Sequence, residues 1–226
     1  LSSTLPIVFK EEKTLIYTCR TTQQNERVLK DLKKIKESKH ACLSALALRG
    51  RAQLCLNEKL MESKKRKKDE EKLKAEDLMN ACGKMRRSGN CTYYDAFKRL
   101  DEIRREMENL NEDKSHEVKE VSQDPLSEME DSTLRRLIDA CRDKIIKTEG
   151  MIQDCKREKI CPYYLSKELL KHMTVIICSY QWIFNPNIIN HFLKDVCKAP
   201  SDMILVIDEC HNLPGALVDI QEKTLS

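Results

Sequence analysis

The residues best suited to chemistry follow an apolar run near the end of the chain. The run Met203–Ile207 is followed directly by Asp208, Glu209, Cys210 and His211. An apolar strand that ends in Asp-Glu is typical of the Walker B motif of P-loop ATPases. In that motif the first carboxylate holds Mg²⁺, commonly through water, and the second orients or deprotonates the attacking water. We predict Asp208, Glu209 and His211 as catalytic residues, with Asp208 and Glu209 binding ATP and Mg²⁺. A buried strand with acidic residues in the following turn is the plainer alternative.

A second motif that P-loop ATPases need does not occur in these 226 residues. No G-x-x-x-x-G-K-[ST] is present, and the single Gly-Lys pair, Gly83-Lys84, is followed by Met85. Residues 1–6 look like the second half of a helix, and a P-loop directly before them would fit that geometry. We therefore expect this polypeptide alone not to hydrolyse ATP.

Short apolar runs predict the strands that position these residues. Three β-prone runs occupy residues 14–18, 174–178 and 203–207. Amphipathic or apolar helical segments are predicted over residues 23–36, 166–172 and 186–198. Apolar strands that alternate with helices predict a parallel sheet covered on both faces, so the expected fold class is α/β.

The middle of the chain, residues 49–165, has a different composition. Apolar residues at helical spacing predict a helix over 97–110, and a polar, acidic loop is expected over 111–132. A second helix, over 133–152, would pair with the first as an antiparallel hairpin. The basic run 64–68 is interpreted as a solvated helix face, with contact to DNA as the alternative.

The amino-acid composition predicts where the protein is located and what chemistry its cysteines serve. Charged residues make up 35% and aromatic residues 5% of the chain, and the formal net charge is only +4, so bulk charge gives little evidence for a nucleic-acid partner. Neither a signal peptide nor a membrane-spanning run is visible, so we expect an intracellular protein. In that setting 11 cysteines indicate metal or redox chemistry, although most of them, such as Cys19 and Cys178, are expected to be small core residues.

Four stretches give a more specific interpretation. They are Leu15–Thr21, Ala47–Cys55, Cys161–Leu165 and Asp208–Asn212. In this order they resemble motif Ia, the first and last cluster-ligand segments, and the DEAH-type motif of the XPD-like iron–sulfur DNA helicases of superfamily 2. The resemblance spans almost the whole chain.

The resemblance implies a domain organisation and an activity. A RecA-like half-domain, residues 1–48 and 166–226, is interrupted by a mainly helical iron–sulfur domain, residues 49–165, with a charged insertion at about 95–155 that could bind a protein partner. The intact protein is expected to move 5′→3′ on single-stranded DNA, driven by ATP with Mg²⁺, and to unwind forked DNA. The expected location is the nucleus in a eukaryote, or the cytoplasm and nucleoid in a prokaryote.

The resemblance also selects ligands for a [4Fe–4S] cluster, which needs four thiolates at one point. It selects Cys55, Cys82, Cys91 and Cys161, with 26, 8 and 69 residues between successive ligands. The last gap is longer than the family usually shows, and Cys155, which lies inside it, competes for a ligand role. Zinc on four thiolates is the rival metal, but the close Cys-x₂-Cys pairs usual in zinc sites are absent.

Candidate DNA contacts follow from the same motifs. Arg20 and Thr21 in motif Ia suit phosphate contacts that position the strand without reading its sequence. Arg51 would brace the cluster or hold DNA, and Tyr163 would stack on a base at the fork. Lys167 stands where relatives often carry Arg, which puts a bidentate phosphate contact there in doubt. For each residue a solvated charge or a core tyrosine is the alternative.

Two other classes of protein remain as alternatives. A non-enzymatic scaffold stabilised by zinc or a cluster would show no ATP dependence even with a P-loop present. A helicase-like nuclease would need a further domain with clustered carboxylates, and these residues supply none.

Overall fold

The computed structural model describes residues 1–39, 42–61, 75–113, 134, 136–141 and 143–225. The basic run 64–68 and most of the expected loop 111–132 lie outside the described residues. The chain forms two compact units. Unit 1 contains residues 1–49, 141–151 and 166–226, and unit 2 contains residues 50–140 and 152–165.

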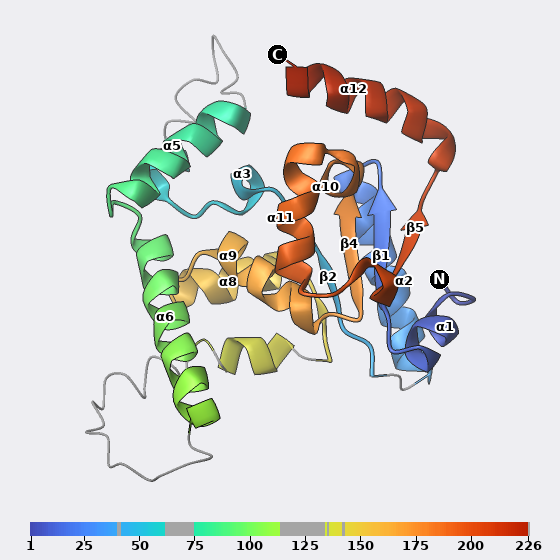
Figure 1. Ribbon diagram of the computed structural model, residues 1–226, viewed down its shortest axis with the longest axis horizontal. Coiled ribbons are helices and arrows are strands. Elements are labelled where there is room, and N and C mark those ends of the chain that lie inside the picture. The colour runs from blue at the N-terminus through green and yellow to red at the C-terminus, as the bar shows by residue number, and fades with distance from the viewer. Residues whose placement is uncertain (40–41, 62–74, 114–133, 135, 142, 226) are drawn as a thin grey trace. The chain divides into compact units, whose positions relative to one another are not determined.

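Unit 1 is built on a five-stranded sheet in which every neighbouring pair of strands is parallel. The strands lie in the order β3-β2-β4-β1-β5, and β4, β1 and β5 can be followed side by side in Figure 1. Their bounds are β1 (Thr14–Cys19), β2 (Ala45–Ala47), β3 (Ile145–Ile146), β4 (Val175–Ser179) and β5 (Met203–Ile207). The α/β class with a parallel sheet is therefore confirmed.

Helices lie on both faces of this sheet (Figure 1). They are α1 (Leu5–Lys10), α2 (Thr22–Lys39), α10 (Tyr180–Phe184) and α11 (Pro186–Val196), while α12 (Leu213–Leu225) follows β5 and contacts α10. Three single 3₁₀ turns join them to the strands: η1 (Leu170–His172), η2 (Pro200–Asp202) and η3 (Cys210–Asn212). No helix among the described residues is both long and apolar enough to cross a membrane.

The core of unit 1 follows from the alternation of side chains along β1. Leu15 and Cys19 pack with Val28, Leu29 and Leu32 of α2, and all five side chains are at least 94% buried. Neighbouring residues on a strand point to opposite faces, so two continuous apolar strands, β1 and β4, can serve both helical layers. This packing fixes where β1 ends and thus where the residues that follow it stand.

Strand β5 differs from the predicted buried strand. It pairs with β1 on one side only and forms an edge of the sheet among the described residues, and Leu205 is 45% exposed. The prediction of the strand itself, residues 203–207, is correct.

Unit 2 is helical in its described residues. Its elements include α3 (Arg51–Leu54), α5 (Ala75–Arg87) and α6 (Thr92–Asp113). The unit boundaries fall inside two further helices, α8 (Thr148–Arg157) and α9 (Pro162–Leu169). A small core of Leu60, Leu78 and Cys82 packs α5 against the segment that follows α3.

Three local predictions are wrong. The helix expected over 133–152 is interrupted near Asp143, whose φ is 54°, and β3 follows before α8 begins. Residues 1–6 do not end a helix, because α1 begins at Leu5 with a proline in its first turn. Most cysteines outside the proposed ligands are not core residues either. Cys19, Cys155 and Cys178 are buried, whereas Cys42, Cys197 and Cys210 are exposed.

Candidate functional site

The first candidate site lies at the carboxyl edge of the parallel sheet. Strand β1 ends next to Arg20, and β5 ends next to Asp208. The two strands are in register, with Thr18 opposite Ile207, and the Asp208 amide donates a 2.9 Å hydrogen bond to the Thr18 carbonyl. Carboxyl ends of parallel strands are where open α/β sheets bind ligands, so the sheet brings the predicted motif Ia and the predicted Walker B residues to one edge.

Two tyrosines hold Asp208 from neighbouring strands. The Tyr17 hydroxyl, on β1, hydrogen-bonds the Asp208 carboxylate, and burial together with that negative charge raises the pKa of Tyr17 to about 12. Tyr180 directly follows β4, and its hydroxyl donates to the backbone carbonyls of Asp208 and Glu209. A neutral tyrosine is a fixed hydrogen-bond donor, so both tyrosines restrain the turn that carries the carboxylates.

Glu209 is part of a chain of hydrogen bonds that reaches β1. Its backbone is left-handed, with φ of 50°, which turns the chain sharply after the strand. Asn212 donates from Nδ2 to Glu209 Oε2 at 3.3 Å and accepts at Oδ1 from Arg20 Nη1 at 3.2 Å. The same amide nitrogen lies 2.9 Å from His211 Nε2. Three predicted site residues, Arg20, Glu209 and His211, therefore share one partner, Asn212.

Cys19 lies beside this edge, but its thiol is expected to be unreactive. Its side chain is fully buried, and burial, followed by the charges of Asp208 and Glu209, raises the pKa of the thiol to about 12. A thiol needs its thiolate form to act as a nucleophile, so Cys19 is a core residue, as the sequence indicates.

Two of the predicted DNA contacts have partners within unit 1. The Thr21 hydroxyl accepts a 3.3 Å hydrogen bond from the backbone N–H of Gln24. In return, the side-chain oxygen Oε1 of Gln24 accepts a 2.8 Å hydrogen bond from the backbone N–H of Thr21. This reciprocal pair is a capping box at the start of α2. Lys167 Nζ forms a 2.9 Å ion pair with Asp195 Oδ2. Both residues thus have a structural role, and DNA binding by either stays a prediction.

The second candidate site is in unit 2 and consists of the four predicted cluster cysteines. Cys91 directly precedes α6, and its carbonyl accepts from the amides of Tyr94 and Asp95. Cys161 directly precedes α9, and its thiol accepts from the amides of Tyr163 and Tyr164. Helix amino termini favour negative charge, so both positions suit a thiolate.

Backbone and side-chain amides link these cysteines to one another. The Cys161 amide donates to the Tyr93 carbonyl at 3.0 Å, which ties the start of α9 to the first turn of α6. The Cys55 thiol accepts a hydrogen bond from the backbone N–H of Asn57, and the side-chain nitrogen Nδ2 of Asn57 lies 4.0 Å from Cys91 Sγ. Asn57 therefore connects two of the predicted ligands, Cys55 and Cys91.

Cys82 and Cys91 influence the ionisation of the other two thiols, Cys55 and Cys161. Burial raises the pKa of Cys55, and the nearby Cys82 and Cys91 raise it further. Burial raises the pKa of Cys161 to about 11, and Cys91 and Cys82 again raise it.

These observations test how well the four cysteines fit a cluster. Among the described residues, no three His, Cys, Asp or Glu side chains are arranged so that they could hold a metal ion as they stand. Cys82 and Cys91 nevertheless lie close enough to Cys55 and Cys161 to raise the pKa of those two thiols, and each of the four cysteines accepts from or approaches an N–H donor. Hydrogen bonds to sulfur are characteristic of iron–sulfur sites, so the donor set fits such a group.

Each cysteine also lies one helical turn from a member of a second cluster. We call Arg51, Arg86, Tyr94 and Tyr164 the guanidinium–tyrosine cluster. Arg51 lies four residues before Cys55, Arg86 four after Cys82, Tyr94 three after Cys91 and Tyr164 three after Cys161. Residues three or four apart along a helix lie on the same side of it, so each member of the cluster is near its cysteine in the chain.

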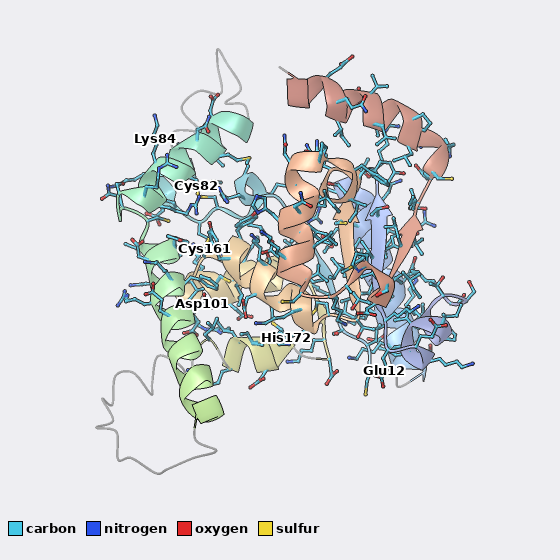
Figure 2. The ribbon with its side chains drawn as sticks, viewed as in Figure 1. Glu12, Cys82, Lys84, Asp101, Cys161 and His172 are labelled. Carbon is cyan, nitrogen blue, oxygen red and sulfur yellow. The ribbon has the colours of Figure 1, made fainter. Side chains whose placement is uncertain are left out.

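The contacts within this cluster are short. The guanidinium carbon of Arg51 lies 4.8 Å from the ring centroid of Tyr163 and 5.9 Å from that of Tyr164. The corresponding distances for Arg86 are 5.2 Å to Tyr94 and 5.5 Å to Tyr164. Tyr164 thus lies between two cations, and the predicted residues Arg51 and Tyr163 contact each other. Figure 2 labels two of the neighbouring cysteines, Cys82 and Cys161.

Sequence reasoning missed several residues of these sites. Tyr17, Asn212, Arg86, Tyr94 and Tyr164 carry contacts that we do not predict. The spacing of one turn from each cysteine is a signal that could have identified the last three. No sequence signal identifies Asn212 as the link between Arg20 and Glu209, because that link depends on the register of two strands distant in sequence.

The DEAD_2 family model matches the chain over residues 17–123 and 112–226, which is nearly its whole length. The chain is also similar to curated helicases. It is 32% identical over 82 residues to the general transcription and DNA repair factor IIH helicase subunit XPD of Dictyostelium discoideum, a match covering 34% of this chain and 10% of that protein. It is 25% identical over 75 residues to subunit XPD/RAD3 of Saccharomyces cerevisiae, covering 33% and 9%.

A longer match is with the regulator of telomere elongation helicase 1 homolog of Arabidopsis thaliana. The two are 23% identical over 209 residues, which is 91% of this chain and 15% of that protein. The chain thus spans less than a sixth of the length of these relatives. With the family match over both units, and with the Asp-Glu motif at the carboxyl edge of a parallel sheet, the chain belongs to the DEAD_2 family of XPD-like superfamily 2 helicases.

Proposed function

We propose that this chain is part of an ATP-driven DNA helicase that moves 5′→3′ on single-stranded DNA and works in DNA repair or genome maintenance. The observation that carries the proposal is the link at the sheet edge, where Asn212 joins Arg20, a predicted DNA contact, to Glu209, a predicted ATPase residue. The names of the similar helicases, which refer to DNA repair and telomere elongation, support the pathway.

The edge residues have distinct roles in this proposal. The Asp208 carboxylate, restrained by Tyr17, holds Mg²⁺ through water, and Glu209 orients or deprotonates the attacking water. His211 lies at the same turn and contacts Asn212. A phosphate of DNA bound at Arg20 would compete with Asn212 for the guanidinium, so DNA binding would change the hydrogen bonding of Glu209. This exchange couples DNA binding to ATP hydrolysis.

DNA binding can be tested on the chain itself. Fluorescence anisotropy with a labelled single strand would compare the wild type with Arg20→Ala and with Arg27→Ala, which removes an exposed arginine of α2. If Arg20 contacts a phosphate, its loss weakens binding and lowers the slope of log K against log salt by about 1. Equal affinities and slopes for Arg20→Ala and Arg27→Ala would rule out the Arg20 contact. The same assay with Thr21→Ala, Arg51→Met, Tyr163→Ala and Lys167→Ala tests the remaining predicted contacts.

We further propose that Cys55, Cys82, Cys91 and Cys161 bind a [4Fe–4S] cluster. When bound, the cluster supplies iron–thiolate bonds that cross-link four segments of unit 2. The amides of Asn57, Tyr163 and Tyr164 donate to the thiolates and orient them. Helicase chemistry needs no redox step, so the proposed role of the group is structural.

Metal analysis separates the cluster from its alternatives. Anaerobically purified protein should contain about four irons and absorb broadly near 400 nm. Cys55→Ser should lose the iron while unit 1 stays folded, whereas the matched variant Cys155→Ser, which changes a buried thiol of α8, should keep it. One zinc in a colourless protein would favour the non-enzymatic scaffold. A full iron complement in Cys55→Ser would overturn the ligand assignment.

A further inference from the structure

Several independent contacts place Arg86 beside the cysteine site. It lies one helical turn after Cys82 on α5, and it hydrogen-bonds both the Cys82 thiol and the Tyr164 hydroxyl. The rings of Tyr94 and Tyr164 flank its guanidinium at 5.2 and 5.5 Å. These contacts fix a planar donor group against the cysteines.

The guanidinium of Arg86 has one buried donor atom that is not used. Its Nε is buried and donates to no acceptor within the described part of the chain, and the same holds for Nε of Arg51. No carboxylate of the described residues forms an ion pair with either guanidinium. A buried N–H donor without an acceptor is unfavourable, and the Cys82 sulfur is an acceptor on the same face of α5.

We infer that Arg86 is a positioning residue for the proposed cluster: it donates a charged N–H···S hydrogen bond to the Cys82 thiolate and offsets the negative charge of the four-thiolate group. This inference rests on the proposed cluster site. Hydrogen bonds and net charge at the sulfurs set the reduction potential of such groups, and bonds from ionised donors are roughly twice as strong as neutral ones. Removing Arg86 therefore makes reduction harder and loosens the hold on iron.

The matched control is the next residue of the same helix. Arg87 is exposed, and its removal changes the net charge of the protein by the same amount. Lys84 likewise lies on an exposed part of α5 and is labelled in Figure 2. Because water and salt screen exposed charges, Arg87→Met should leave the sulfur atoms almost unaffected.

The experiment compares the wild type, Arg86→Met, Arg86→Lys and Arg87→Met after anaerobic purification. Iron content, the midpoint potential from a spectroscopic redox titration, and the rate of iron release to a chelator are measured for each. Arg86→Met should change the ratio of reduced to oxidised group at a fixed potential roughly tenfold towards oxidised, which is about 59 mV for a one-electron couple. Arg86→Lys keeps the charge and should fall between Arg86→Met and the wild type, and Arg87→Met should match the wild type.

The outcomes separate this inference from the proposed function. A wild-type protein without iron would refute the cluster, and the inference with it. A loaded wild type whose potential and iron-release rate are unchanged in Arg86→Met would refute the role of Arg86 alone. If no protein is reduced in the accessible range, iron release decides, and a roughly tenfold faster release confined to the Arg86 variants supports the inference. If Arg86→Met does not fold, Arg86→Lys against Arg87→Met provides the same comparison.

Discussion

At the scale of single residues, Asn212 has the contacts of a coupling residue rather than a catalytic one. It touches Arg20, Glu209 and His211, and it follows the Asp-Glu motif by only three residues. In the full-length protein, Asn212→Ala should leave basal ATP hydrolysis nearly intact but reduce its stimulation by single-stranded DNA several-fold. The measurement is steady-state ATPase activity with and without DNA.

Asn190→Ala is the control for that prediction, since Asn190 is an exposed asparagine of α11 remote from the motif in sequence. It should behave as the wild type. An unchanged stimulation ratio in Asn212→Ala would mean that the link from Arg20 to Glu209 is only structural.

The cysteines give a second prediction at this scale, on reactivity and pH. Burial raises the pKa of the Cys19 thiol from near 9 to about 12, and it raises that of Cys178 as well. At pH 8 a thiol-alkylating reagent should therefore modify the exposed Cys42, Cys197 and Cys210 and spare both buried thiols, as read by mass spectrometry. Equal labelling of Cys19 and Cys210 in the folded protein would contradict the burial of β1.

The raised pKa of Cys19 also makes the stability of the folded state depend on pH. The unfolded chain ionises its thiols near pH 9, whereas the folded chain keeps Cys19 protonated until about pH 12. The folded state is therefore favoured below pH 9, and that advantage is lost as the pH rises from 9 towards 12.

At the scale of elements, helix α2 offers two ion pairs in different surroundings. Arg49, which follows β2 and is 5% exposed, pairs with Glu26 of α2 and also donates to the Thr22 carbonyl. Lys33 and Glu37 pair on the solvent side of the helix, with 53% and 64% of their side chains exposed. The buried pair joins two elements, while the exposed pair stays within one.

Arg49→Met should lower the free energy of unfolding by about 1–3 kcal/mol, because it leaves Glu26 without its partner in a partly buried place. Lys33→Met, the matched change on the same helix, should cost less than about 0.5 kcal/mol. Urea unfolding of both variants measures the difference. Similar losses for the two would show that Arg49 does not hold α2 to the sheet.

The elements that the sequence predicts correctly are those with long apolar runs. Strands β1, β4 and β5 are each five or six residues long and mostly β-prone, and α2 and α11 each carry an apolar stripe. Strands β2 and β3 are only three and two residues long. So short a run has no measurable period, and only pairing with β4 and with each other makes these residues strands.

In the candidate sites, too, some residues can be predicted from the local sequence and others depend on the fold. Asp208 and Glu209 are readable from the sequence because the motif is contiguous with its strand. The contacts of Tyr17 and Asn212 are not, since both arise where β1 and β5 lie in register although nearly 190 residues separate them. Lys167 is a further case, because its ion pair with Asp195 depends on the fold rather than on the local sequence.

At the scale of the whole molecule, the two units and the proposed cluster together predict a selective response to a chelator. A bound metal group stabilises the segments that hold its ligands, so a chelator should destabilise unit 2 and leave the sheet of unit 1 protected. Hydrogen exchange followed by mass spectrometry should show faster exchange in α5, at the start of α6 and in α9, with β1 and β4 unchanged. A uniform loss of protection across both units would show that they unfold as one body.

The path of the chain between the units limits how the protein can be shortened. The chain crosses from one unit to the other after residues 49, 140, 151 and 165, because the segment 141–151 returns to unit 1 to supply β3. A deletion that joined residue 49 to residue 166 would remove this strand and leave β2 with an unpaired edge. Open edges recruit strands from other molecules, so such a truncated protein should self-associate. A shortened form of unit 1 must therefore retain the eleven-residue segment 141–151, which lies between two stretches of unit 2 in the sequence.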